Sequence, residues 1–171
     1  MEFSAQVTFP ASAEVVARMI TTEAYVLEKV AAAGSPPGQV EIIRSPDGTI
    51  TITTRHHVAA NQVPATYRSL VGRHLDVHQV DVWEAAGPGG SRRGTLAIEV
   101  AGAPVRVTGT LALAPSAGDE STLHLAGTIK ASVPFIARTI EKAIADRVDH
   151  AVDIERGVGL RWLAEGEPRD A

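Results

Sequence analysis

Hydrophobic and polar residues alternate over the first nine positions of the chain, which predicts a β-strand with one dry face. The apolar members of this pattern are Phe3, Ala5, Val7 and Phe9. Pro10 ends the strand. Ser12 is then placed to cap a short helix, and a second helix is predicted from Thr22 through an alanine run to Gly34, a suitable residue after a helix end.

From Val40 to Ile129 the dominant period is two, and turn signals recur roughly every ten to fifteen residues. This arrangement favours an antiparallel meander of six strands over alternating β-α-β units. One irregularity lies within residues 75–82, where the apolar positions change phase at His78 and Gln79. The change indicates either a β-bulge or a strand that is buried unevenly on its two faces.

The segment Val133–Glu165 has the period of a helix and is predicted to form one long amphipathic helix. At about 100° per residue its apolar positions fall within a stripe roughly 120° wide. The stripe consists of Val133, Ile136, Ile140, Ile144, Val148, Ala151, Ile154, Val158 and Trp162. A helix of this length needs a large apolar surface, so we expect a curved sheet to hold it.

The length of 171 residues suits one domain, which we place at residues 1–165, with a tail at 166–171. The absence of cysteine excludes disulfides and thiolate metal sites. A net charge of −4 gives no electrostatic reason to expect nucleic acid or an anionic membrane as a partner. No secretory leader pattern and no run long enough for stable membrane insertion is evident, so we expect a cytoplasmic protein.

Four stretches resemble a known superfamily: FSAQVTFPASAEVVARMIT at 3–21, VDVWE at 80–84, GAPVRVTGTLALAP at 102–115 and HLAGTIKASVPFIARTIEKAIADRV at 124–148. Over essentially the whole chain the pattern resembles the helix-grip fold of the START-domain and birch-pollen-allergen superfamily (SRPBCC). Within it, the chain resembles a bacterial branch catalogued as a domain of unknown function.

The resemblance implies an α+β fold: a curved antiparallel sheet of about seven strands, two short helices after the first strand, and a long C-terminal helix over the concave face. It also implies an internal cavity of the kind that often receives lipids, sterols, polyketides or other apolar molecules. Members of the superfamily include both enzymes and carriers, so the resemblance does not choose between these activities.

Residues that share the dry faces of the strands and the apolar stripe are the candidates for such a cavity, although the same residues could fill a solid core. These candidates are Ile52, His56, Val63, Tyr67, Leu75, Val77, Ile98, Val107, Leu111, Leu125, Ile129, Ile136, Ile140, Ile144, Arg147, Val148, Ala151 and Glu155. Val63 and Tyr67 contribute to the apolar edge of a short helix predicted from Pro64 to Val71, which either gates the entrance or simply covers the end of the sheet.

Polar residues near the apolar stripe are the candidates for chemistry. Arg147 could anchor a ligand carboxylate or phosphate with Glu155 as its partner, or both could extend from the edge of the stripe into water, the reading that we favour. His56, on an apolar strand face, is either a core residue or an acid-base group. An enzyme of the cyclase, dehydratase or hydrolase type would use His56, Glu155 or Asp81 as acid or base, within a cavity that shifts the pKa.

His74, Asp76 and His78 alternate onto one face of a strand near His57, and together these residues could supply nitrogen and oxygen ligands to a metal ion. We favour a polar ladder on the solvent face, so we predict no metal ligands. No sequence motif for a cofactor or a nucleophile is present, and none is predicted.

The function that the sequence favours is binding of a hydrophobic or amphipathic small molecule, such as a lipid, for transport, storage or sensing. An enzyme that uses the same cavity is the first alternative, and it is less favoured because the acid-base residues are not concentrated in one inward-facing segment. A protein-interaction module with a filled interior is the second. In that case Trp83 and Trp162 would contact the partner, whereas packing in the core is their more ordinary role.

Overall fold

The structure, a computed structural model, describes residues 1–36, 38–59, 74–101 and 103–165. Within them the elements are, in chain order, β1 (Glu2–Phe9), α1 (Ala13–Ile20), α2 (Glu23–Ala32), β2 (Gln39–Arg44), β3 (Ile50–Ala59), β4 (His74–Trp83), the 3₁₀ turn η3 (Pro88–Gly90), β5 (Arg92–Ala101), β6 (Val105–Pro115), β7 (Ser121–Ala131), α3 (Ala137–Ala145) and α4 (Val148–Glu165). No helix among the described residues combines the length and apolar character needed to cross a membrane.

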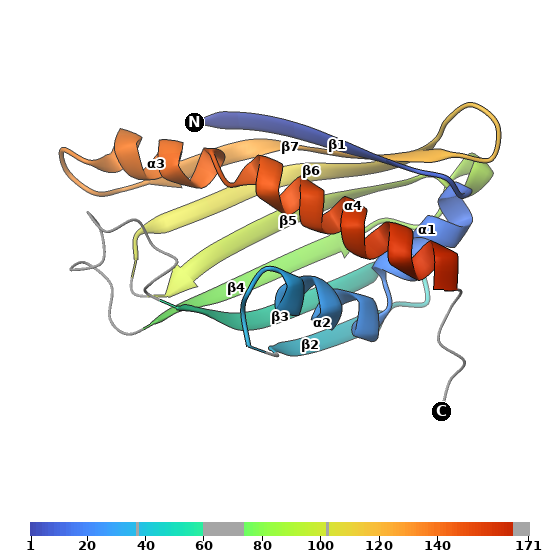
Figure 1. Cartoon of the computed structure of the whole chain (residues 1–171), viewed down its shortest axis with the longest axis horizontal. Helices are drawn as coiled ribbons and strands as arrows, with labels where there is room; N and C mark the ends of the chain where they lie inside the picture. The colour runs from blue at the N-terminus through green and yellow to red at the C-terminus, as the bar shows by residue number, and fades with distance from the viewer. Residues whose placement is uncertain (37, 60–73, 102, 166–171) are drawn as a thin grey trace.

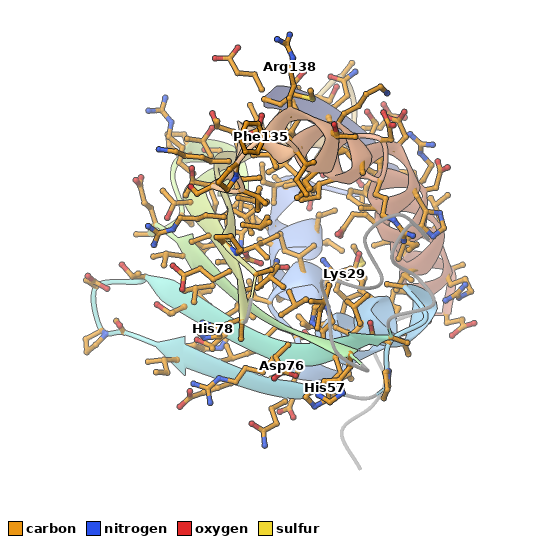
Figure 2. The ribbon with its side chains drawn as sticks, turned by 90° about the vertical axis from the view of Figure 1, so that its left-hand side faces the viewer. Lys29, His57, Asp76, His78, Phe135 and Arg138 are labelled. Atoms are coloured by element: carbon orange, nitrogen blue, oxygen red, sulfur yellow. The ribbon has the colours of Figure 1, made fainter. Side chains whose placement is uncertain are left out.

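The strands form one antiparallel sheet in the order β1-β7-β6-β5-β4-β3-β2. Strands β2 to β7 follow one another as a meander, and β1 pairs with β7. Helix α4 crosses one face of this sheet, α2 lies beside it, and the sheet bends around both (Figures 1 and 2). The predicted α+β helix-grip architecture is therefore confirmed.

Local signals place the first two helices as predicted, and a glycine also sets the turn of the β2–β3 hairpin. The Ser12 hydroxyl accepts a hydrogen bond from the Val15 N–H (3.4 Å) and caps α1. Gly34 follows the end of α2 with φ 77°, and Gly48 in the β2–β3 turn has φ 86°. These are backbone conformations that favour glycine, so both positions fix where an element ends.

The pairing of β4 excludes a β-bulge, one of the two interpretations of the change of phase in its sequence. It pairs with β3 from Ile50↔Trp83 to Ala59↔His74 and with β5 without any interruption, so it contains no bulge. The uneven burial is real, because the inward-facing side chains include two polar residues, Gln79 and Asp81. The change of phase in the sequence thus marks polar side chains on the inner face of a regular strand.

The prediction of one helix over Val133–Glu165 is wrong, because α3 and α4 are separate. Phe135, with φ 67°, precedes α3 and is incompatible with a right-handed helix at that point. Glu141 holds α3 at the edge of the sheet: its carboxylate accepts from the Ala131 N–H (3.0 Å) and the Met1 ammonium (3.2 Å). At Arg147 the backbone forms a tighter turn: its N–H donates to the carbonyl of Ile144, three residues earlier (3.0 Å). Helix α4 then crosses the sheet.

The solid core lies at one end of the molecule, where the C-terminal half of α4 packs on β1, α1 and α2. Phe9, Val16 and Tyr25 are completely buried there. The Trp162 ring packs edge-on against Tyr25 (centroids 5.5 Å apart), and its indole N–H donates to Glu28 (2.5 Å). Trp83 is 3% and Trp162 8% exposed, so both tryptophans are core residues rather than contact residues on the surface.

Substitutions at two glycines of α4, Gly157 and Gly159, test this packing. A methyl group at Gly159 would stand 2.4 Å from the buried Phe9 ring and 3.2 Å from the Met19 methyl, whereas one at Gly157 would meet nothing within 4 Å. We expect Gly159→Ala to lower the free energy of unfolding by roughly 1–3 kcal/mol through overpacking. Gly157→Ala should raise it by up to about 1 kcal/mol, because alanine favours a helix.

Urea denaturation followed by circular dichroism measures both changes. Equal effects of the two substitutions would contradict close packing of α4 on β1 at Gly159.

Candidate functional site

A cavity of about 400 Å³ lies between the concave face of the sheet and the helices that cover it. Every strand except β2 contributes to its wall, together with α1, α2, the end of α3 and α4. Most of the wall is aliphatic or aromatic. Its apolar sheet residues are Phe3, Ala5, Val7, Trp83, Leu96, Ile98, Val107, Leu111, Leu123, Leu125 and Ile129.

The structure places eleven of the predicted cavity residues in this wall, counting described residues only: His56, Ile98, Val107, Leu111, Leu125, Ile129, Ile144, Arg147, Val148, Ala151 and Glu155. Arg147 and Ala151 are exposed as well as lining, so they lie at the rim. The interior is therefore not filled in the way that the protein-interaction alternative required.

Five other predicted residues do not line the cavity: Ile52, Leu75, Val77, Ile136 and Ile140. Ile52 is 2% exposed and belongs to the solid core. The face of β4 that carries Leu75 and Val77 extends beyond the cavity, and the two isoleucines lie farther from α4 than Ile144, the α3 residue that does line it. Val63, Tyr67 and the predicted helix at 64–71 lie outside the described residues.

Four polar side chains from three elements form one polar part of the wall. Asp81 and Gln79 come from β4, Lys29 from α2 and Glu155 from α4. The Gln79 amide nitrogen donates to both Asp81 carboxylate oxygens (3.0 and 2.9 Å). The Lys29 ammonium donates to Glu155 Oε2 at 2.6 Å. We call these four residues the polar wall.

The Asp81 carboxyl is the group in the wall whose protonation is most altered. Burial raises its pKa to about 6, although the Lys29 charge and the Gln79 hydrogen bonds oppose the rise. Near pH 6 the carboxylate and the carboxylic acid are therefore both populated. In either form it offers a hydrogen bond to a molecule in the cavity: as a carboxylate it accepts one, and as a carboxylic acid it donates one.

The Lys29–Glu155 pair holds α2 against α4 at the cavity. Burial lowers the pKa of the Lys29 ammonium, but the charge of Glu155 and the hydrogen bond to it outweigh burial, so the pKa is raised and the charge is kept. Tyr25 donates its hydroxyl proton to Glu155 Oε1 at 2.6 Å, and burial followed by the Glu155 charge raises the pKa of this phenol. Glu155 is thus partnered on both carboxylate oxygens, and it does not extend into water as the favoured reading expected.

His56 stands apart from the polar wall, on β3. Its Nδ1 atom is buried and has no hydrogen-bond partner among the described residues. Burial, and to a smaller extent the neighbouring His57, lowers the pKa of its imidazole, so the ring is neutral at pH 7. A neutral imidazole with an unused ring nitrogen is available to a ligand as a hydrogen-bond donor or acceptor.

Sequence reasoning named Asp81, Glu155 and His56 but missed Lys29 and Gln79. The signal for Gln79 was the phase change in β4, since Gln79 and Asp81 occupy positions that Leu75 and Val77 predict to be apolar. Lys29 gave no such signal, because lysine near the end of an amphipathic helix is ordinary. Its role depends on contacts across more than 120 residues of chain, as in Lys29–Glu155 with a separation of 126.

A model of the family described as "Protein of unknown function (DUF2505)" matches residues 4–163. The chain belongs to this family. An uncharacterised protein of Mycobacterium tuberculosis is similar to it, with 30% identity over 122 residues that cover 68% of this chain and 67% of the relative.

Solved structures show the same fold at low sequence identity. The Zhui aromatase/cyclase of Streptomyces sp. R1128 is 14% identical over 96% of this chain and 94% of its own, with a TM-score of 0.58. A START superfamily protein of Mycobacterium smegmatis is 14% identical over 95% of this chain and 98% of its own, with a TM-score of 0.54. The fold is therefore of the START type.

The raised pKa of Asp81 predicts a specific dependence of stability on pH. A carboxyl whose pKa is higher in the folded state stabilises that state when it is protonated. This contribution is fully present below about pH 4 and is lost as the pH rises through about 6. Asp81→Asn removes the titration, so the stability of the variant relative to the wild type should increase from pH 4 to pH 7, by at most about 3 kcal/mol.

Chemical denaturation at several pH values measures this difference. Asp119→Asn, in the exposed β6–β7 loop, serves as the control for loss of one negative charge. Parallel stability curves for the wild type and Asp81→Asn would show that burial does not perturb Asp81.

Proposed function

We propose that the protein binds one small amphipathic molecule in the cavity, with its apolar body on the sheet and a hydrogen-bonding group against the polar wall. The composition of the cavity wall supports this proposal most directly: six strands contribute an apolar surface, and Gln79 and Asp81 face the same space. Such a combination is typical of small-molecule sites, where apolar contact gives affinity and a few polar groups give orientation.

The size of the cavity limits the ligand. A volume of about 400 Å³ lies at the lower end of the range of small-molecule pockets, roughly 300–1,000 Å³. Each 100 Å² of ligand apolar surface removed from water would contribute about 2.5 kcal/mol. We therefore favour a compact molecule, such as a single-chain lipid or a fused-ring compound, over a lipid with several long chains.

Proteins of this fold support both a carrier and an enzyme. One similar structure is named an aromatase/cyclase, and another, human StarD13, is described as a lipid transfer and protein localization domain. We favour binding for transport, storage or sensing because His56 lies apart from Asp81 and the rest of the polar wall. In the β3–β4 hairpin His56 pairs with Val77 and Asp81 with Ile52, so four residues, about 13 Å of strand, separate the two groups.

An enzyme remains the second candidate, and the Asp81 carboxyl beside Lys29 is the observation that favours it, since a pKa near 6 suits a general acid or base. The two functions differ in the fate of the ligand. A carrier releases the molecule chemically unchanged. A dehydratase, or a cyclase that closes a ring with dehydration, releases a product lighter by one water, and Asp81→Asn would then stop this change while leaving binding.

A cavity-filling substitution tests the proposal. Leu125 on β7 faces the cavity, opposite Ala5 and Leu111, while the adjacent His124 is exposed on the other face. After incubation with a bacterial lipid extract, native mass spectrometry should show a 1:1 adduct of the wild-type protein. We expect Leu125→Trp to reduce the adduct at least tenfold, because the indole occupies ligand volume, and His124→Trp to retain it.

Circular dichroism establishes that both variants are folded, and organic extraction with mass analysis identifies the bound compound. A wild-type protein that stays free of any adduct, or an adduct that Leu125→Trp retains in full, would contradict ligand binding in the cavity.

A further inference from the structure

The face of the sheet opposite the cavity carries a second cluster, formed by His57, His74 and Asp76. We propose that these three residues bind a divalent transition-metal ion, with Zn²⁺ as the best match to the donor set. The inference is independent of the proposed function, because no member of the cluster lines the cavity.

The strand register brings the three side chains together. His57 on β3 lies directly opposite Asp76 on β4, and His74 precedes Asp76 by two positions on the same face. Since His56 and Asp81 face the cavity, the alternation along both strands turns His57, His74 and Asp76 outward. Figure 2 shows His57 and Asp76 together on the side of the sheet away from the helices, and Lys29 on the side that faces them.

The donor atoms are already close to a coordination geometry. His57 Nδ1 lies 2.5 Å and His74 Nε2 lies 3.4 Å from Asp76 Oδ1, and one donor atom of each residue lies within 4.8 Å of the others. In a tetrahedral zinc site with ligand distances near 2.0–2.1 Å, neighbouring donors stand about 3.3 Å apart. The cluster therefore needs only small side-chain rotations to surround an ion.

Because the cluster is exposed, its side chains can rotate at little cost in free energy, and water can occupy the remaining coordination positions of an ion. The side chains are 61% exposed for His57 and 55% for both His74 and Asp76. The two imidazole rings also pack edge-on, with centroids 4.9 Å apart. Three protein ligands on one side with open positions on the other form the arrangement found at catalytic zinc sites and at two-histidine, one-carboxylate iron sites.

The chemistry of the donors selects the kind of ion. Two imidazole nitrogens and one carboxylate oxygen suit Zn²⁺ and neighbouring transition-metal ions, whereas Mg²⁺ and Ca²⁺ prefer oxygen ligands alone. Without an ion the cluster is a polar ladder of exposed hydrogen bonds, which contributes little to stability. An ion held by both strands would join β3 to β4 near the ends that border residues 60–73, and so raise the melting temperature.

The test uses the full chain without a histidine tag, stripped with a chelator. Isothermal titration with Zn²⁺ alone should show one site of micromolar affinity. His57→Ala, His74→Ala and Asp76→Asn should each weaken it at least tenfold. His150→Ala, which removes an exposed histidine of α4, should leave it unchanged.

Two spectroscopic measurements test the site without any substitution. Visible absorption of the Co²⁺-loaded wild type reports nitrogen and oxygen coordination, and the ¹⁵N shifts of the imidazoles on Zn²⁺ addition identify the ligands. Shifts at His57 and His74 would support the site. The absence of saturable binding, or equal binding by the three cluster variants and the wild type, would overturn it.

Discussion

The packing of α4 on the concave sheet is the constraint on which the rest of the structure depends. At its C-terminal end this packing is tight: Gly159 allows the helix to approach the Phe9 ring, and Trp162 closes the core against Tyr25. Toward its N-terminus α4 continues across a bent sheet, and the side chains between them do not fill the space. One helix therefore closes a core at one end and roofs a cavity at the other.

The cavity keeps polar groups at some cost to folding. Burial raises the pKa of the Asp81 carboxyl above its value in the unfolded chain. At neutral pH, where the group is mostly ionised, it therefore destabilises the folded state. Apolar residues at positions 79 and 81 would remove this cost and continue the pattern of Leu75 and Val77. Polar residues that replace apolar ones at inward-facing positions are expected where a site has a function, and this agrees with a ligand that forms hydrogen bonds.

Much of the fold could be predicted from the sequence because its signals are local. Alternation gives the strands, and glycines with positive φ end their elements where Gly34 and Gly48 stand. The division between α3 and α4 could not be predicted, since Ile140 and Ile144 continue the helical period and the separation reflects the anchoring of Glu141 by Met1 and Ala131. The polar wall was predicted only in part, because the Lys29–Glu155 pair joins segments 126 residues apart.

The most direct test of ligand binding in the cavity is a crystal structure of the protein purified with the adduct that it retains from a lipid extract. We expect continuous density between the sheet and α4, with an apolar part along Val107 and Leu111 and a polar atom within hydrogen-bond distance of Asp81 or Gln79. A cavity that contains only water, or one closed by inward movement of α4 while the adduct lies elsewhere, would contradict it.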